Sequence, residues 1–491
     1  MKSLMIQGTS SNAGKTILVA ALCRILSDKG YKVTPFKSQN MSLNSYVAND
    51  GEMAYAEAVQ AWAAREEPRV DMNPILLKPK GEGVSQVIVH GKPYADLHVR
   101  DYYAFAEIEG IRAVKESYER LEREYDVCII EGAGSPAEIN IKHDISNMRI
   151  ARMADAPVLL VADIELGGVF ASIIGTIDLI GDDRCRVAGT VINKFRGDAS
   201  LLDSGIEYIY ERTGIPNLGI LPYADLDIPV EDSVSIEKMV SYGGVVDIAV
   251  IRLPYVSIFA DIEPLLMEEG VGVRWVYRRA ELGSPDLVII PGSKNTINDM
   301  EFLNKTGIAD RIKELAGEGV AIIGLCGGYQ MLGDVIIDHS VEGGGDGQMV
   351  EGLGLLNLKT EFKEYKKIVR RTKAKIADKG GMLKGGEVTG YEIHMGVTDG
   401  EEDVSFMADY PVGHVNTAGN VIGTYLHGVF DEKTFRGSVL DHLFEMKGVL
   451  PPQHLDFETF REKGFRKLAA LVSRHLDLER VMEIIEGGEW G

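Results

Sequence analysis

The sequence predicts an α/β protein with two doubly wound domains, each a parallel sheet covered by helices, and a short helical segment after them. Short, almost continuously apolar runs alternate with amphipathic stretches, which is typical of parallel strands buried on both faces. A glycine-rich turn follows a predicted strand at residues 8–16 and again at 324–328. We therefore expect domains at 1–240 and 246–435, and helices over 436–491.

The positions of the elements follow from this periodicity. In the first half, strands are expected at residues 4–7, 33–36, 127–131, 158–162 and 187–193. A helix is expected over 17–28, and another over 105–121, where apolar residues recur every three or four positions. The glycine pair at 243–244 marks a restart, so the domain boundary is expected at 235–246. In the second half, strands are expected at residues 246–251, 287–290, 320–325 and 421–426.

Composition excludes several classes of protein. The chain has 491 residues, of which 45% are hydrophobic and 26% charged, as in ordinary globular proteins. Its formal net charge of −22 argues against nucleic acid as a partner, because a phosphate backbone needs a basic face. No apolar run is long enough to span a membrane, and the first strand begins too early for a signal peptide, so we expect a cytoplasmic protein. The four cysteines are far apart, which makes a disulfide framework or zinc site improbable.

The first glycine-rich turn, GTSSNAGKT, has the features of a phosphate loop. Its glycines let backbone N–H groups surround phosphate oxygens, Lys15 supplies a positive charge, and Thr16 offers a hydroxyl to Mg²⁺. The following helix directs its positive end toward the same anion. Five residues separate Gly8 from Gly14, one more than in the common loop. An ordinary strand-to-helix turn is the alternative, but the strand, loop and helix together favour a nucleotide site.

The second turn has the features of a nucleophile elbow. In VAIIGLCGGYQML an apolar strand ends at Leu325, Cys326 occupies the turn, and a helix is expected from Tyr329. Small neighbours permit a tight turn that exposes the side chain, and a helix N-terminus favours the thiolate. The N–H of Gly327 is suitably placed to stabilise an oxyanion. A buried core cysteine is the alternative interpretation.

A cysteine nucleophile needs a base, and His427 is the candidate. It stands 101 residues after Cys326, at the end of an apolar run, and strand ends meet at one edge of an α/β sheet. Gly292, which also follows a strand, is a candidate for the second oxyanion N–H. A purely structural histidine at position 427 is the alternative, and His394 is better explained as a structural residue or a substrate contact.

The motifs GLCGGYQ at 324–330 and YLHG at 425–428 together resemble the class I glutamine amidotransferase family, which has a flavodoxin-like fold. The resemblance implies that Cys326 attacks the side-chain amide of L-glutamine and releases ammonia, with His427 as general acid and base. The chain departs from the usual triad, because Val429 occupies the position of the expected glutamate. The resemblance therefore leaves open which group orients His427.

The first half resembles the dethiobiotin synthetase group of P-loop enzymes, which have the same lengthened loop and use ATP to activate a carboxylate-type oxygen. The resemblance implies that Lys37 is a second active-site lysine, that Glu131 binds Mg²⁺ and that Asn193 reads adenine. The implied ATP contacts are Gly8, Thr9, Asn12, Gly14, Lys15, Thr16, Lys37 and Asn193, and the implied Mg²⁺ ligands are Thr16, Glu131 and Asp50. A capping role stays open for Glu131, as does an ordinary loop role for Asp50.

Segments along nearly the whole chain resemble the cobyric acid synthase family. They are PFKSQNMSLNS (35–45), MNPILLKP (72–79), QVIVHGK (86–92), VEGLGLL (350–356) and GYEIHMG (390–396). The family uses ATP, Mg²⁺ and glutamine to amidate the b, d, e and g carboxylates of adenosylcobyrinic acid a,c-diamide, a corrinoid of cobalamin biosynthesis. The candidate corrinoid contacts are Gln39, Asn40, Ser42 and Asn44, although each could equally form a turn.

Two other functions stay open at this point. Cobyrinic acid a,c-diamide synthase has the same two domains and amidates other carboxylates, but it resembles this chain less in QNMSLNS and MNPILLKP. A partition-type ATPase switch with a glutaminase-like binding module is the non-synthetic alternative, and the intact elbow disfavours it. The sequence does not predict the oligomeric state.

Overall fold

The computed structural model describes residues 1–49, 51–81, 83–138, 144–224, 236, 239–241, 243–342 and 347–488. The chain forms two compact units, each considered by itself. The first comprises residues 1–42, 50–229 and 461–491, and the second comprises residues 43–49 and 230–460. These units divide the chain at other points than the expected domains, because most of the C-terminal helical segment belongs to the first unit and residues 43–49 belong to the second.

Six parallel strands form the central sheet of the first unit. In spatial order they are β12 (Asn217–Pro222), β11 (Val187–Phe195), β10 (Val158–Asp163), β1 (Lys2–Gly8), β9 (Val127–Glu131) and β2 (Val33–Phe36). The five predicted strands are confirmed, and β12 is an addition to them. β9 and β2 lie on one side of β1 in the sheet, and β10, β11 and β12 lie on the other side. Ligands in such sheets bind where the strand order reverses, which here is the carboxyl end of β1.

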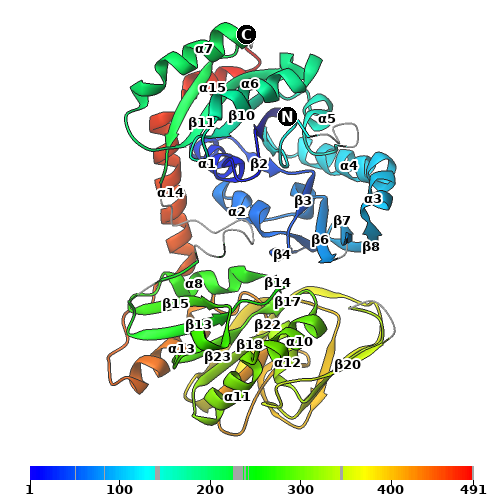
Figure 1. Cartoon of the computed structure of the whole chain (residues 1–491), viewed down its shortest axis with the longest axis vertical. Coiled ribbons are helices and arrows are strands. Elements are labelled where there is room, and N and C mark those ends of the chain that lie inside the picture. Colours follow the sequence, from blue (N-terminus) through cyan, green and yellow to red (C-terminus); the bar gives the residue numbers. More distant parts are fainter. Residues whose placement is uncertain are drawn as a thin grey trace. The chain divides into compact units, whose positions relative to one another are not determined.

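Several helices belong to the first unit. They are α1 (Lys15–Asp28), α2 (Tyr55–Ala63), α3 (Val99–Phe105), α4 (Ile111–Glu122), α5 (Met148–Met153), α6 (Val169–Leu179), α7 (Asp203–Thr213), α14 (Phe457–His475) and α15 (Leu478–Glu486). α1 packs on β1, β2 and β9, while α6 packs on β10 and β11 (Figure 1). The helix predicted over 105–121 is confirmed as α4 together with the end of α3 and a π-helical turn at Ala106–Gly110.

An insertion between β2 and β9 adds a small sheet to the first unit. Its strands are β3 (Gln39–Met41), β6 (Ile75–Gly81), β7 (Val84–Val89) and β8 (Lys92–His98), and β5 (Gly51–Ala54) lies in the same insertion. The insertion also contains α2, whose residues are almost all buried. This helix supplies two side chains to the carboxyl end of the central sheet.

The second unit has a nine-stranded sheet that is only half parallel. In spatial order the strands are β15 (Val271–Val276), β13 (Val246–Ile251), β16 (Leu287–Ile290), β18 (Ala321–Leu325), β27 (Val421–Thr424), β26 (Pro411–Val415), β25 (Asp403–Met407), β22 (Ile368–Gly380) and β23 (Leu383–His394). The strands from β15 to β27 are parallel, and four of them, β13, β16, β18 and β27, were predicted, whereas β15 is an addition. The four from β26 to β23 extend the sheet antiparallel, which the apolar pattern did not reveal.

Shorter elements complete the second unit. The helices are α8 (Glu263–Leu266), α9 (Arg279–Leu282), α10 (Thr296–Thr306), α11 (Ile308–Gly317), α12 (Gly327–Leu332) and α13 (Lys433–Met446). The further strands are β4 (Ser45–Ala48), β14 (Val256–Ser257), β17 (Gly292–Ser293), β19 (Val335–Asp338), β20 (Gln348–Glu351), β21 (Leu358–Phe362) and β24 (Val397–Gly400). One large cluster of buried apolar side chains spans this unit and includes Cys326 and Tyr329.

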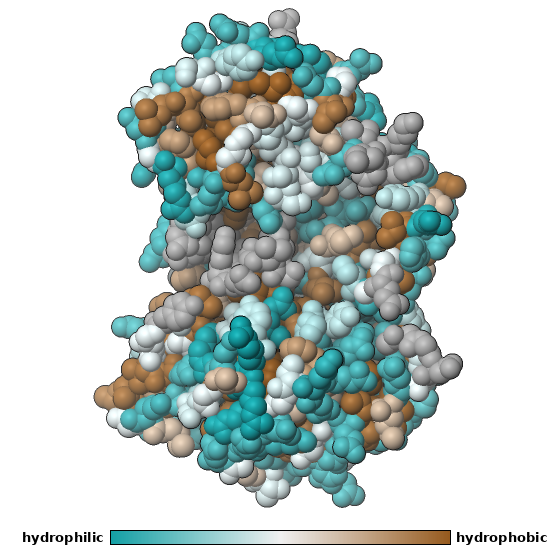
Figure 2. All heavy atoms as spheres, viewed as in Figure 1, coloured by the Kyte–Doolittle hydropathy of each residue, from teal (hydrophilic) through white to brown (hydrophobic). Residues whose placement is uncertain are grey.

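None of the described helices combines the length and apolar character that a membrane crossing requires. The face drawn in Figure 2 carries hydrophilic and hydrophobic residues side by side.

Candidate active sites

The phosphate loop joins β1 to α1, as predicted. Asn12 and Gly14 have positive φ angles of 59° and 100°, so the backbone curls before α1 begins at Lys15. The Lys15 ammonium folds back and donates to the carbonyl of Ser10 over 3.0 Å. A Cβ on Gly8 would lie 3.0 Å from Lys15 Nζ, so the glycine leaves room for the lysine. A positive charge above a curled backbone suits a bound phosphate.

Asn193, at the end of β11, lies against the same loop. Its Nδ2 donates to the carbonyl of Ala13 over 2.9 Å. A Cβ on Gly14 would collide with this Nδ2, so the close approach depends on the glycine. Thr9 is fixed from the other side, because its backbone N–H donates to Val161 of β10. The structure therefore brings the predicted residues of the loop together with Asn193.

Glu131 stands at the end of β9 and joins three elements. β9 pairs with β1 so that Glu131 lies opposite Ile6, two residues before the loop begins. Its Oε1 accepts from Thr16 Oγ1 over 2.8 Å and from Lys37 Nζ over 2.7 Å. Burial raises the pKa of Glu131, but the charge and hydrogen bond of Lys37 outweigh burial and lower it. Glu131 is therefore a carboxylate at neutral pH, in contact with two of the residues predicted for ATP and Mg²⁺.

The donor set fits a hard divalent cation. Thr16 and Glu131 offer hydroxyl and carboxylate oxygens, the ligands that Mg²⁺ prefers, and this ion commonly takes its remaining ligands from phosphate and water. Over the described residues, no group of three or more His, Cys, Asp or Glu side chains could hold a metal by itself. Asp50, the third predicted ligand, lies outside the described residues.

Two residues of α2 reach this site, and the sequence analysis missed both. Gln60 donates from Nε2 to Glu131 Oε2, and Glu57 lies 3.6 Å from Lys37 Nζ. Both side chains are fully buried. They are polar residues three positions apart in the otherwise apolar helix YAEAVQAWA, which places them on one face. That spacing is the pattern by which they could have been found.

The four predicted corrinoid contacts do not share one environment. Gln39 accepts a short hydrogen bond from Tyr102, and Asn40 donates from Nδ2 to both oxygens of Glu57, at 3.0 and 3.1 Å. The backbone N–H of Ser42 donates to the small sheet. Asn44 belongs to the second unit, where its Oδ1 accepts from the backbone of Ala260.

Cys326 forms the predicted elbow between β18 and α12. Its φ and ψ angles are 48° and −103°, a conformation that non-glycine residues rarely adopt. The turn is possible because its neighbours lack side chains. A Cβ on Gly324 would lie 2.7 Å from the backbone of Gly328, and a Cβ on Gly328 would collide with the carbonyl of Ile290. The thiol Sγ lies 3.5 Å from the carbonyl of Ile393.

His427 has the acidic partner that the sequence left open. Its Nδ1 lies 2.7 Å from Oδ2 of Asp261, whose Oδ1 accepts from the N–H of Gly428 over 2.7 Å. Val429, at the position of the usual glutamate, is buried in the apolar core. Asp261 precedes His427 by 166 residues and sits in no recognisable motif, which is why sequence reasoning missed it. β27 ends two residues earlier than predicted, where Leu426 donates to the hydroxyl of Thr424.

The imidazole of His427 is fully buried, and the charges of neighbouring residues decide its protonation state. Burial lowers the pKa of His427, but the negative charges of Asp261 and Cys326 outweigh burial and raise the pKa to about 10. Nε2 is buried and has no hydrogen-bond partner among the described atoms. With Nδ1 engaged by Asp261, Nε2 is the nitrogen left to exchange a proton with a nucleophile.

The predicted oxyanion residues lie beside this pair. A Cβ on Gly292 would stand 3.0 Å from Cε1 of His427, so the glycine lets strand β17 touch the imidazole. A Cβ on Gly327 would stand 2.7 Å from the backbone nitrogen of Ser293. Strand β17 and the start of α12 are thus in direct contact beside Cys326. Backbone N–H groups in this arrangement are suited to a developing oxyanion.

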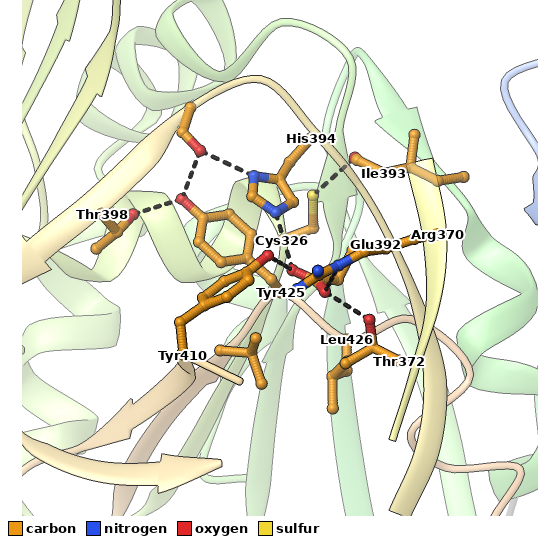
Figure 3. A network of polar contacts seen from close by, with 12 residues as sticks. Cys326, Arg370, Thr372, Glu392, Ile393, His394, Thr398, Tyr410, Tyr425 and Leu426 are labelled. Carbon is orange, nitrogen blue, oxygen red and sulfur yellow. Dashed lines mark hydrogen bonds and ion pairs between the residues drawn. The ribbon is translucent and has the colours of Figure 1, made fainter. Parts of the chain in front are cut away.

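A buried polar network flanks Cys326 (Figure 3). Glu392 accepts from the side chains of Arg370, Thr372 and Tyr410 over 2.9, 2.6 and 2.7 Å. Burial raises the pKa of Glu392, but these hydrogen bonds and that of His394 outweigh burial and lower the pKa to about 2. His394 lies between oxygens of Glu392 and Gly396 and stacks on Tyr425, with ring centroids 3.7 Å apart. The imidazole of His394 is therefore held at both nitrogens and on one ring face.

Comparisons with known proteins match both halves of the chain. The CobB/CobQ-like glutamine amidotransferase domain matches residues 247–435, and an AAA domain matches residues 2–228. The chain is 47% identical to a probable cobyric acid synthase of Methanosarcina barkeri, over 99% of each chain. It is 47% identical to the cobyric acid synthase of Moorella thermoacetica, over 99% of this chain and 97% of the relative. It is 45% identical to a probable cobyric acid synthase of Methanothermobacter thermautotrophicus, over 99% of each chain. The chain therefore belongs to the cobyric acid synthase family of glutamine-dependent amidoligases.

Proposed function

We propose that this enzyme converts adenosylcobyrinic acid a,c-diamide to cobyric acid in cobalamin biosynthesis, by amidating the b, d, e and g side-chain carboxylates with ATP and glutamine. The observation that carries the proposal is the presence of two complementary sites in one chain. The elbow at Cys326 has a histidine held by a buried aspartate, and the phosphate loop has a carboxylate held by a lysine. The first suits the release of ammonia from an amide, and the second suits the activation of a carboxylate.

The glutaminase half-reaction takes place at Cys326. The thiolate attacks the side-chain carbonyl carbon of glutamine, and the oxyanion is stabilised by the N–H groups of Gly327 and Gly292. His427, protonated and held by Asp261, gives its Nε2 proton to the departing nitrogen, which leaves as ammonia. Water then attacks the thioester, with His427 as the base, and releases glutamate. The raised pKa of His427 supports its role as the proton donor in the first step.

The synthetase half-reaction needs ATP because a carboxylate oxygen is a poor leaving group. Attack of the corrinoid carboxylate on the γ-phosphorus of ATP gives an acyl phosphate and releases ADP, and ammonia then displaces inorganic phosphate to form the amide. Lys15 and Lys37 offset the negative charge that gathers around the γ-phosphate. Thr16 and Glu131 would hold Mg²⁺, which supplies further charge neutralisation when bound.

The proposed nucleotide and corrinoid contacts follow from the positions of these residues in the chain and in the first unit. Asn193 is assigned to the adenine of ATP because it lies against the phosphate loop. Gly8, Thr9, Asn12 and Gly14 are assigned to the loop that surrounds the phosphates. Gln39, Asn40 and Ser42 are retained as corrinoid contacts because they follow β2 near Lys37 in the chain. For Asn44, the hydrogen bond to Ala260 favours a role in supporting the turn before Asp261.

The product mass tests the proposal directly. Purified enzyme is supplied with ATP, Mg²⁺ and glutamine, together with either adenosylcobyrinic acid or its a,c-diamide. We expect four amidations of the diamide and no amidation of the a and c carboxylates. Two amidations of adenosylcobyrinic acid that stop at the a,c-diamide would instead identify an a,c-diamide synthase. ATP hydrolysis with neither corrinoid amidation nor glutamine hydrolysis would support a partition-type switch.

A further inference from the structure

We propose that Tyr391 and residues 43–49, which pack on it, form a positioning element for His427. The inference rests on the proposed glutaminase reaction and adds residues that act through the histidine. The second unit comprises residues 230–460 together with residues 43–49 from the N-terminal half of the chain. A stretch of the N-terminal half would thus help to set the geometry of the glutaminase site.

Tyr391 holds both the backbone and one face of His427. The N–H of Tyr391 donates to the carbonyl of His427 over 3.0 Å, and the N–H of His427 donates back over 2.9 Å. The two rings are stacked, with centroids 5.6 Å apart and planes inclined by 27°. Tyr391 is itself buried. β27 ends at Thr424. The antiparallel bridge between Tyr391 and His427 therefore extends the backbone hydrogen bonding beyond the strand to His427.

Residues 45–47 in turn hold Tyr391. The phenol hydroxyl of Tyr391 donates to the carbonyl of Ser45 over 3.3 Å. The ring of Tyr46 meets the ring of Tyr391 edge to face, with centroids 5.3 Å apart. Val47 is buried in one apolar cluster with Tyr391, Ile258 and Ile393. Residues 45–47 therefore hold the ring of Tyr391 in the position in which it stacks on His427.

Residues 43 and 44 hold the other support of His427. The carbonyl of Leu43 accepts from the N–H of Ile258 over 3.2 Å, and Oδ1 of Asn44 accepts from the N–H of Ala260 over 3.4 Å. Ala260 immediately precedes Asp261. Ile258 has a φ of 52°, a left-handed conformation that is costly for a β-branched side chain and persists only where its surroundings impose it. The segment thus supports the turn that carries Asp261.

One segment therefore contacts Tyr391 directly and supports the turn before Asp261 through the backbone of Ile258 and Ala260. Tyr391 sets the plane of the ring, and Asp261 sets its rotation and tautomer. Misplacing a catalytic group by about 1 Å can cost roughly a hundredfold in rate. Loosening the segment should accordingly slow the glutaminase step without removing any residue that contacts glutamine or ATP.

The test measures glutamine hydrolysis in the full-length enzyme without corrinoid, so it stands independently of the substrate proposed above. Tyr46→Ala removes the edge contact on Tyr391, and Tyr46→Phe preserves it. We expect Tyr46→Ala to lower the kcat of glutaminase about tenfold to a hundredfold, with little change in the KM for glutamine. Tyr46→Phe should retain activity close to that of the unsubstituted enzyme. Tyr391→Leu should move the alkaline limb of the glutaminase profile to lower pH, because His427 is then held less firmly against Asp261.

Ammonia-dependent formation of ADP with a corrinoid carboxylate serves as the folding control, since it bypasses Cys326. Unchanged glutaminase kcat in both Tyr46→Ala and Tyr391→Leu would overturn the proposal. An equal loss of the ammonia-dependent reaction would also overturn it, because the segment would then support the whole fold rather than His427. If no corrinoid is amidated by any variant, the proposed substrate is wrong, whereas the glutaminase comparison still decides the role of the segment.

Discussion

Asp261 Oδ2 lies 2.7 Å from His427 Nδ1, and the two residues are 166 positions apart in the chain. This buried contact replaces the glutamate that glutamine amidotransferases of this class usually place two residues after the histidine, where this chain has Val429. The carboxylate fixes the tautomer of the imidazole and leaves Nε2 for proton transfer. It also anchors the backbone of Gly428, so it acts on the position of the histidine as well as on its charge.

Asp261→Asn should lower glutaminase activity strongly. The asparagine keeps the shape but presents the wrong donor pattern to Nδ1, and a change of this kind costs about 10⁴ in kcat in a serine protease triad. We expect a loss of about a hundredfold or more, with ammonia-dependent amidation retained. A glutaminase rate within a factor of about two of the parent enzyme would show that Asp261 does not orient His427.

The same variant should change the pH dependence. The charge of Asp261 is the main effect that raises the pKa of His427, so removing it lets burial lower that pKa from about 10. The protonated imidazole is then lost at lower pH, and the alkaline limb of the glutaminase profile moves toward neutrality. The measurement is kcat for glutamine hydrolysis across the alkaline range, and an unmoved limb would contradict this assignment.

Cys326→Ala should abolish glutamine-dependent synthesis and preserve synthesis from ammonium salts. The nucleophile is lost, whereas the carboxylate is still activated at the phosphate loop. The check is a comparison of product formed from glutamine and from ammonium chloride at alkaline pH. Loss of both reactions would mean that Cys326 supports the fold or the synthetase site.

Lys15→Ala should remove amidation from either nitrogen source while leaving glutamine hydrolysis measurable. Lys15 folds over the phosphate loop, and its charge is needed for the γ-phosphate. Glu131→Gln offers a second variant at the same site, and it should raise the Mg²⁺ concentration required for half-maximal rate. Persistent ammonia-driven synthesis in Lys15→Ala would contradict the nucleotide assignment.

Gly328→Ala should destabilise the second unit and inactivate the glutaminase. The added Cβ would collide with the carbonyl of Ile290, and forced overpacking costs about 1–3 kcal/mol. Gly317→Ala is the matched control, because a Cβ there meets no atom within 4 Å. Thermal unfolding compares the two, and equal melting temperatures would show that the elbow tolerates a side chain.

Local motifs made the two chemical centres predictable. The loop around Lys15 and the elbow at Cys326 each consist of a strand, a glycine-rich turn and a helix that are continuous in sequence. Their residue spacing therefore reports the three-dimensional arrangement directly. The parallel strands were also predictable, because strands such as β9 and β18 are buried on both faces and read as unbroken apolar runs.

The partners of these centres were not predictable in the same way. Asp261 reaches His427 from a different segment, and Glu57 reaches Lys37 from an insertion, so no short spacing records either contact. The antiparallel strands β22 and β23 alternate buried and exposed residues along much of their length. They therefore contain no continuous apolar run by which they could be recognised in the sequence. The membership of residues 43–49 in the second unit depends on long-range packing, which local pattern does not encode.

The most direct measurement is the mass of the corrinoid product formed from adenosylcobyrinic acid a,c-diamide, ATP and glutamine labelled with ¹⁵N in its side-chain amide. The account predicts four added amides, each carrying the label, and none when ATP is omitted or Cys326 is replaced. A corrinoid that gains no amide while glutamine is hydrolysed would contradict the proposed substrate. Amides that arise without the label would contradict the supply of ammonia from Cys326.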